Sequence, residues 1–178
     1  MSHNNLPLAD AAALDAEALY ATLLAQVKAG LAEASDPAIL GIHSGGAWIA
    51  ERLARDLGLS ERCGAIDVSF YRDDYAKKGL PAEVKPTQIG FNVDGATILL
   101  VDDVLYTGRT TRAAINELFD YGRPARIMLA SLVDRGERQL PIAADFVAAH
   151  TRVGQGKALR LQQSDAGTFT LTIVEDHA

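Results

Sequence analysis

Apolar residues follow two periodicities along the 178-residue chain, and each predicts a different kind of element. Between residues 10 and 34, leucine and valine recur every four or five positions with no proline, which is typical of an amphipathic helix. Short apolar runs at 38–43 and 96–101 are instead bounded by turn-forming residues, which is typical of buried strands. A helical pattern follows each of these strands, at 47–59 and at 108–122.

Further strands are predicted within residues 63–74 and at 126–134, so strand, helix and strand alternate twice. This order indicates an α/β fold with a mostly parallel sheet and helices on both of its faces. Beyond residue 134 the chain changes character, and residues 134–178 are expected to form a small additional unit of strands. Its strand-like runs lie at 144–150, 158–163 and 169–174.

The length favours a single domain over residues 1–178. Residues 1–9 lack a periodic pattern, which predicts a flexible N-terminal tail. Residues 73–90 are mostly polar and contain Pro81 and Pro86, which predicts a long loop. Because long loops in compact domains often cover binding sites, we expect this one to act as a mobile lid.

Composition excludes only a few classes of function. A formal net charge of -6 argues against a surface that is basic throughout, although a local basic patch for nucleic acid stays open. Cys63 is the single cysteine, so neither an intrachain disulfide nor a multi-cysteine metal site is expected, in keeping with a cytoplasmic location. Neither a signal-peptide pattern nor an apolar run of about 20 residues is present, so no membrane association is expected.

The most informative stretch is ILLVDDVLYTGRTTR at residues 98–112. A buried strand leads into Asp102 and Asp103, and a Thr-Gly-Arg-Thr turn at 107–110 then opens a helix. Ligands bind beyond the carboxyl ends of strands in such sheets, and the amides of a helix N-terminus bind phosphate. Adjacent carboxylates would repel that phosphate, but they can accept hydrogen bonds from two vicinal hydroxyls. A ligand with both features is a ribose phosphate.

Each part of this stretch has a simpler explanation when it is taken alone. A pair of aspartates after an apolar run is often a turn or helix cap, and a Thr-Gly turn is common. The combination is far less expected by chance. It is not a P-loop, because the G-x-x-x-x-G-K-[ST] pattern is missing. A receiver domain would need a further phosphorylatable aspartate and a distant lysine, and it gives the Thr-Gly-Arg-Thr turn no role.

The stretch resembles the motif with which type I phosphoribosyltransferases bind phosphoribosyl diphosphate (PRPP). Together with SFYRDD, YGRPA and LVDRGERQLPI, it resembles the PyrR family over about residues 38–147. Members of that family are uracil phosphoribosyltransferases, and many also attenuate pyrimidine operons by binding leader RNA. The resemblance implies the type I phosphoribosyltransferase fold, a central mostly parallel sheet flanked by helices, with residues 134–178 as a small hood.

The resemblance also implies a role for each motif. Asp102 and Asp103 would hold the ribose hydroxyls, and residues 107–110 would cradle the 5-phosphate. The whole PRPP-binding segment would comprise Val101, Asp102, Asp103, Val104, Leu105, Tyr106, Thr107, Gly108, Arg109 and Thr110. The loop around the diphosphate would comprise His43, Ser44, Gly45 and Gly46.

Three further residues are implied outside these segments. Arg72 would approach the diphosphate when the lid closes, and is a catalytic candidate beside the two aspartates. Arg135 and the backbone near Val133 would lie by the base. Tyr106 stands where purine-specific relatives carry an acid that serves the base, which favours a pyrimidine. Mg²⁺ would bind through PRPP oxygens rather than directly to the protein.

The implied reaction converts uracil and PRPP to UMP and diphosphate, in a homodimer or larger homo-oligomer. The diphosphate loop departs from the Thr-Arg-Gly that is common in the family, so a positive charge is missing, which a protonated His43 could partly replace. The family's histidine after VDRG is Glu137 here, and Lys28 is the single basic residue within 1–34, which speaks against specific RNA binding. Two alternatives stay open: a UMP-sensing, RNA-binding attenuator with little catalysis, and a phosphoribosyltransferase for another base.

Overall fold

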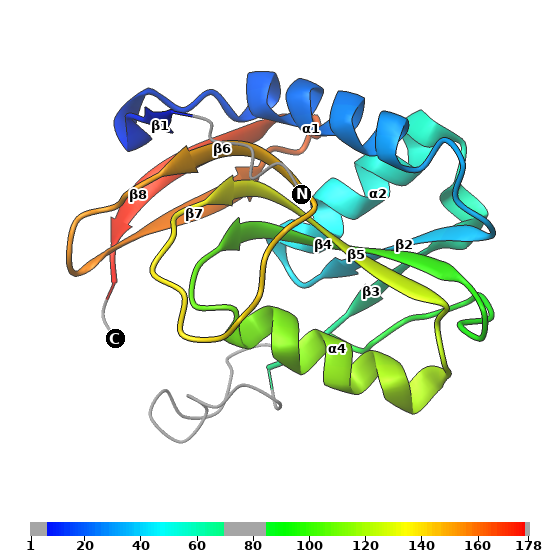
Figure 1. The fold of residues 1–178 in the computed structure, drawn as a ribbon. Helices are drawn as coiled ribbons and strands as arrows, with labels where there is room; N and C mark the ends of the chain where they lie inside the picture. Colours follow the sequence, from blue (N-terminus) through cyan, green and yellow to red (C-terminus); the bar gives the residue numbers. More distant parts are fainter. Residues whose placement is uncertain (1–6, 70–84, 177–178) are drawn as a thin grey trace.

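A six-stranded parallel sheet forms the centre of the computed structural model, which describes residues 7–69 and 85–176 (Figure 1). Its strands lie in the order β1-β6-β5-β4-β2-β3. The strands are β1 (Leu8–Ala9), β2 (Pro37–Ile42), β3 (Cys63–Ile66), β4 (Thr97–Leu105), β5 (Arg126–Asp134) and β6 (Phe146–Thr151). Two strands, β7 (Lys157–Gln163) and β8 (Phe169–Glu175), form a separate antiparallel hairpin.

Helices cover both faces of the sheet, as the alternating pattern predicted. Helices α1 (Ala16–Gly30) and α2 (Gly45–Leu57) lie on one face, and α4 (Arg109–Tyr121) lies on the other (Figure 1). Strand β4 is buried on both faces, so its side chains alternate between two cores. Leu99 and Val101 pack on the side of α1 and α2, whereas Ile98 and Leu100 pack on the side of α4.

The N-terminal segment differs from the prediction at two places. Leu8–Ala9 are not part of a tail, because they pair with His150 and Thr151 of β6 and close the edge of the sheet. The long predicted helix over 10–34 is also shorter. Asp10 and Asp15 each accept hydrogen bonds from amides that follow them, and so they cap a short 3-10 turn and α1 as separate elements.

The C-terminal unit is also smaller than the predicted hood over 134–178. Its first strand, β6, joins the main sheet beside β5, so the separate part is the β7–β8 hairpin. Glu17 of α1 attaches this hairpin: its carboxylate accepts two hydrogen bonds of 2.8 Å from Arg52 of α2 and one of 2.7 Å from the amide of Phe169. Phe169 itself is buried in the α1–α2 core.

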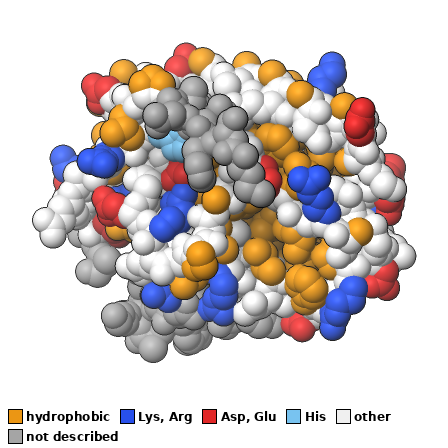
Figure 2. All heavy atoms as spheres, viewed as in Figure 1, with side chains coloured by type: hydrophobic (Ala, Val, Ile, Leu, Met, Phe, Trp, Pro, Cys, Tyr) orange, Lys and Arg blue, Asp and Glu red, His pale blue; other side chains and the backbone are white. Residues whose placement is uncertain are grey.

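The face of α4 carries a surface hollow. Apolar side chains gather between α4 and the sheet in the space-filling view (Figure 2). Ile115, Ile127, Leu129 and Ile142 line a hollow of about 190 Å³ there. Within the described residues, no helix is long and apolar enough to cross a membrane.

Candidate active site

The two aspartates lie inside β4, near its carboxyl end, rather than directly after the strand. Asp102 is buried and pairs with Ser131 of β5, whereas Asp103 is half-buried. Asp102 Oδ1 accepts a hydrogen bond of 3.0 Å from the amide of Asp103. Burial raises the pKa of the Asp103 carboxyl, and hydrogen bonding with Asp102 and to backbone amides offsets only part of that rise.

Ser131 stabilises the strand end from which the aspartates project, and sequence reasoning missed it. Its side chain is fully buried. The hydroxyl accepts a hydrogen bond of 3.1 Å from the amide of Leu105 and donates one of 2.8 Å to the carbonyl of Val133. No motif marks this serine, because its role depends on two strands that are distant in the sequence.

The predicted diphosphate loop lies directly against the aspartates. A Cβ on Gly45 would lie 2.4 Å from Asp103 Oδ2, and a Cβ on Gly46 would lie 2.3 Å from the carbonyl oxygen of Val101. Only glycine therefore allows α2 to begin this close to β4. The approach brings the positive end of the α2 dipole beside the carboxylates. His43 and Ser44 precede this helix start, and the peptide bond between them is cis.

The surroundings of His43 disfavour the protonated form that could replace the positive charge that this loop lacks. Its backbone amide donates a hydrogen bond of 3.0 Å to the carbonyl of Ile66 at the end of β3. Burial of the imidazole, together with the positive charge of Lys85, lowers the pKa of His43, although Asp67 opposes the shift. The structure therefore favours a neutral imidazole at neutral pH, contrary to the expectation that protonation would compensate.

The turn at residues 107–110 begins α4 on the opposite side of β4. Gly108 has a φ of 89°, which a side chain would strain, and a Cβ there would lie 3.0 Å from Ile142. The carbonyl of Thr107 accepts hydrogen bonds of 3.0 and 3.2 Å from the amides of Gln139 and Leu140. The segment after β5 thus fixes the turn, with the N-terminus of α4 at the same edge of the sheet as the aspartates.

Arg72 and residues 73–84 of the predicted lid lie outside the described residues. Residues 85–90, the end of the predicted lid, are held in place instead. Gln88 exchanges two backbone hydrogen bonds of 2.8 and 2.9 Å with Ala65 of β3. The hydroxyl of Thr87 donates to buried Glu117 of α4 and accepts from the amide of Asp67 at 3.0 Å. This end of the segment is therefore anchored alongside β3.

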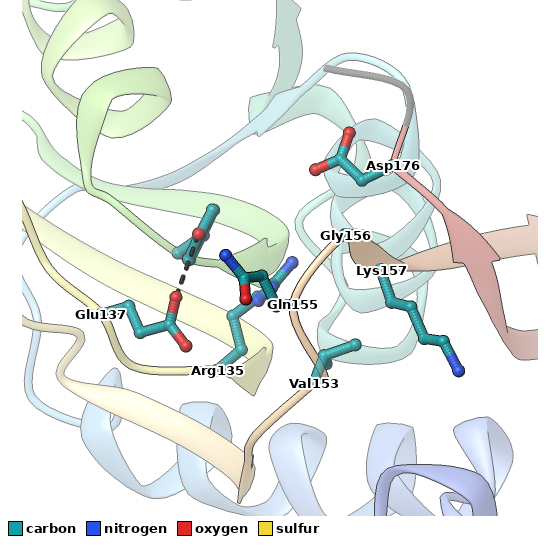
Figure 3. Close-up of a pocket in the computed structure, with 8 residues that line it drawn as sticks. Arg135, Glu137, Val153, Gln155, Gly156, Lys157 and Asp176 are labelled. Carbon is teal, nitrogen blue, oxygen red and sulfur yellow. Dashed lines mark hydrogen bonds between the residues drawn. The ribbon is translucent and has the colours of Figure 1, made fainter.

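A cavity of about 350 Å³ opens beyond the ends of β4 and β5 (Figure 3). Arg135, predicted to lie by the base, lines it, whereas Val133 is fully buried within β5. Tyr106, which the resemblance already set near the base, also lines the cavity. Sequence reasoning missed the lining role of Glu137, Val153, Gln155 and Asp176. Glu137 stood out only as a departure from the family, and the loop and hairpin residues carry no motif.

These features define a class of protein. Strand β4, with two aspartates near its carboxyl end, lies between a glycine helix start and a phosphate-type turn. A cavity of about 350 Å³ opens beyond them, and this is the arrangement of a phosphoribosyltransferase. The family model described as a phosphoribosyl transferase domain matches residues 11–162. The chain is therefore a pentosyl-transferring enzyme of this family.

Similar proteins narrow the class further. The protein named Bifunctional protein PyrR from Ralstonia nicotianae is 57% identical over 164 residues, which cover 89% of this chain and 94% of that protein. The protein of the same name from Nitrosococcus oceani is 43% identical over 166 residues, covering 91% and 94%. The chain belongs to the PyrR family of type I phosphoribosyltransferases.

Solved structures support the fold alone. A purine phosphoribosyltransferase from Pyrococcus horikoshii matches with a TM-score of 0.58 at 24% identity, over 76% of this chain and 82% of that one. A hypoxanthine-guanine phosphoribosyltransferase from Bacillus anthracis matches with a TM-score of 0.61 at 18% identity, over 82% and 85%. At these identities, the purine bases in their names carry no information about the base used by this chain.

Proposed function

We propose that the chain transfers the phosphoribosyl group of PRPP to uracil, forming UMP and diphosphate, and that it takes part in regulating pyrimidine biosynthesis. One observation carries the assignment. The aspartate pair, the start of α2 at Gly45 and the start of α4 at Gly108 all meet at one carboxyl edge of the sheet. The membership of the PyrR family favours uracil over other bases.

The residues at this edge can each bind a different part of PRPP. Asp102 and Asp103 accept hydrogen bonds from the two ribose hydroxyls. The turn at 107–110 and the first amides of α4 hold the 5-phosphate, where the helix dipole favours negative charge. The start of α2 faces the diphosphate in the same way. Because the pKa of His43 is lowered, the amides at the start of α2 supply the attraction that the loop at 43–46 itself offers on this side.

Magnesium fits this site as an ion that arrives with PRPP. Among residues 7–69 and 85–176, no group of three histidine, cysteine or acidic side chains could hold a metal. Mg²⁺ commonly keeps several waters and binds together with substrate phosphates, so the ion would be held through PRPP oxygens and would leave Asp102 and Asp103 to the ribose hydroxyls. When bound, the ion supplies charge neutralisation for the departing diphosphate.

The identity of the acceptor base is tested by incubating the purified protein with PRPP, Mg²⁺ and, in separate reactions, uracil, hypoxanthine, guanine or orotate. We expect diphosphate release with uracil alone. Release with a purine or with orotate, and none with uracil, would contradict the assignment. No release with any base, together with measurable binding of UMP, would instead support the alternative of a nucleotide sensor.

RNA binding is the second candidate function, and one feature favours it. Arg152, Lys157 and Arg160 are exposed within nine residues of the C-terminal hairpin region. Binding to RNA phosphates through such a cluster should weaken steeply as salt rises. Affinity for a pyrimidine-operon leader RNA that does not change between low and physiological salt would contradict this function. We also propose a homodimer or larger homo-oligomer, which sedimentation would test.

A further inference from the structure

The carboxyl ends of β2 and β3 lie side by side, and the loop at 43–46 leaves from the end of β2. Ile42 is level with Ile66, and the amide of His43 donates a hydrogen bond of 3.0 Å to the carbonyl of Ile66. This bond continues the pairing of the two strands one step into the loop. Because neighbouring strands lie about 4.8 Å apart, the residues that follow Ile66 flank the loop.

Asp67, the first residue after β3, holds a segment of the chain that returns to this edge. Its Oδ2 accepts a hydrogen bond of 2.7 Å from the amide of Lys85, and its own amide donates one of 3.0 Å to the hydroxyl of Thr87. Gln88 pairs antiparallel with Ala65 of β3. Because the segment runs opposite to β3, Lys85 lies beyond the carboxyl end of that strand, at the edge where the diphosphate loop begins.

Two further contacts fix the backbone of Lys85 in this position. The hydroxyl of Thr87 donates a hydrogen bond of 2.5 Å to Oε1 of Glu117, a residue of α4 that is only 7% exposed. Asp67 Oδ1 accepts a hydrogen bond of 2.8 Å from the amide of Ser69 and another from its hydroxyl. Donors of the chain therefore occupy both oxygens of Asp67, so this carboxylate acts as an anchor for the backbone.

The ammonium of Lys85 is left available to a ligand. Its side chain is half-buried, and among residues 7–69 and 85–176 no acidic side chain forms an ion pair with it. Its charge nevertheless reaches the loop. Next to burial, the positive charge of Lys85 is the main cause that lowers the pKa of His43, and Asp67 opposes it. A fixed segment thus presents a cation to the residue that opens the diphosphate loop.

The diphosphate loop needs such a cation. Ser44, Gly45 and Gly46 carry no charge, and the N-terminus of α2 supplies only about half an elementary charge. A departing diphosphate gains negative charge as its bond to C1 breaks. A lysine ammonium is a compact charge on a flexible stem with three rotatable donors, which suits a group that moves as it leaves.

We propose that Lys85 binds the diphosphate group of PRPP and supplies the positive charge that the loop at 43–46 lacks, with Asp67 as its positioning residue. This inference rests on the proposed function. The ammonium donates hydrogen bonds to diphosphate oxygens and keeps its protons. These bonds strengthen as the bond from C1 to oxygen breaks and its electron pair passes to the diphosphate. UMP carries no diphosphate, so Lys85 contributes nothing to UMP binding.

The test compares Lys85→Gln with wild type in three quantities: the KM for PRPP, and the Kd values for diphosphate with Mg²⁺ and for UMP, both from calorimetry. A hydrogen bond to a charged group is commonly worth about 10-fold or more in binding. We expect the KM for PRPP and the Kd for diphosphate to rise by about 10-fold, with an unchanged Kd for UMP. Lys85→Arg keeps the charge and should restore most of the affinity. Lys28→Gln is the matched control, because Lys28 is exposed at the end of α1 and should leave all three values unchanged.

The possible outcomes separate this inference from the proposed function. Unchanged values for PRPP and diphosphate in Lys85→Gln would overturn the role of Lys85. Equal losses for diphosphate and UMP would also overturn it, because they would show a structural effect on the whole site. A wild type that binds diphosphate but transfers to no base would instead overturn the proposed function, while the diphosphate comparison would still decide the role of Lys85.

The location of the ammonium has a readout that does not depend on activity. In an NMR titration of the histidine ring protons, removing the cation in Lys85→Gln should raise the pKa of His43. Lys28→Gln should leave this titration unchanged. An unchanged pKa of His43 in Lys85→Gln would place the ammonium away from the loop and would contradict the inference.

Positioning by Asp67 is tested with a double-mutant cycle. Asp67→Ala frees the amide of Lys85 and should weaken diphosphate binding about as much as Lys85→Gln, again without changing the Kd for UMP. Because the two residues act as one unit, the double variant should bind diphosphate no more weakly than either single variant. Fully additive losses would overturn the positioning role. If Asp67→Ala does not fold, Asp67→Asn replaces it, since it keeps the size of the side chain but gives up one of the two acceptor oxygens.

Discussion

The contact between Gly45 and Asp103 makes Gly45→Ala the sharpest test of the active-site geometry. In the structure, a Cβ at residue 45 would lie 2.4 Å from Asp103 Oδ2, 2.6 Å from its Cγ and 2.9 Å from its Cβ. An ordinary contact is about 3.5–4.0 Å. The whole Asp103 side chain must therefore move by about 1 Å, because no single rotation relieves all three overlaps.

The expected consequence is a loss of activity that exceeds the loss of stability. A misplacement of about 1 Å near the reacting groups can lower a rate by about 10²-fold, which corresponds to about 2.7 kcal/mol of transition-state stabilisation. Overpacking typically costs about 1–3 kcal/mol of folding free energy, while replacing glycine by alanine within a helix contributes about 1 kcal/mol in the opposite direction. The net change in unfolding free energy should thus lie at about 0–2 kcal/mol.

Two measurements on the same preparation separate these effects: kcat/KM for PRPP from diphosphate release, and thermal unfolding. Gly46→Ala provides a contrast, because its Cβ would meet the backbone of β4 at 2.3 Å, and it should mainly lower stability. Gly154→Ala is the control, since the nearest atom to its Cβ would be 3.9 Å away. A folded Gly45→Ala protein with wild-type kcat/KM for PRPP would refute the placement of the substrate beside Asp103.

Two further predictions concern charged side chains. Asp103→Asn should lower turnover chiefly by weakening the hold on the ribose hydroxyls; unchanged kcat and KM for PRPP would exclude that role. Glu17→Ala should destabilise the protein by about 1–3 kcal/mol at neutral pH, because it leaves Arg52 and the amide of Phe169 without their acceptor. Hydrogen bonds from Arg52 and Phe169 lower the pKa of Glu17, so its stabilisation is complete above the ordinary value of 4.5 and is lost as pH falls through the lowered pKa in the folded state. Urea unfolding of both proteins across this pH range measures the difference; a gap that stays constant down to low pH would contradict the ion-pair origin.

Local patterns in the sequence were enough to predict the class of fold and to propose the centre of the site. The apolar run before Asp102 and Asp103 predicts a buried strand because such runs suit a parallel strand covered on both faces. The glycine and threonines at 107–110 predict a helix start that can bind phosphate because those residues act on the backbone next to them. Both features are encoded within a few residues, so they are visible without any tertiary contact.

Edges and boundaries were less predictable because they depend on distant partners. Leu8–Ala9 form a strand only because β6 offers an edge more than 140 residues away in sequence. Strand β6 resembles the hairpin strands in its own sequence, and pairing with β5 is what places it in the main sheet. Likewise, residues 85–90 read as a polar loop, but their hydrogen bonds with Ala65 and Glu117 hold them in place.

By itself, the sequence determined the α/β order of elements, the aspartate pair with its phosphate-type turn, and the resemblance to the PyrR family. Only the tertiary structure decided how those parts act on one another. It set Gly45 against Asp103, lowered the pKa of His43 by burial, and buried Arg135 beside the ring of Tyr106. The physical reason is that burial, electrostatic environment and close contact depend on which distant segments pack together, and no short stretch of sequence encodes that alone.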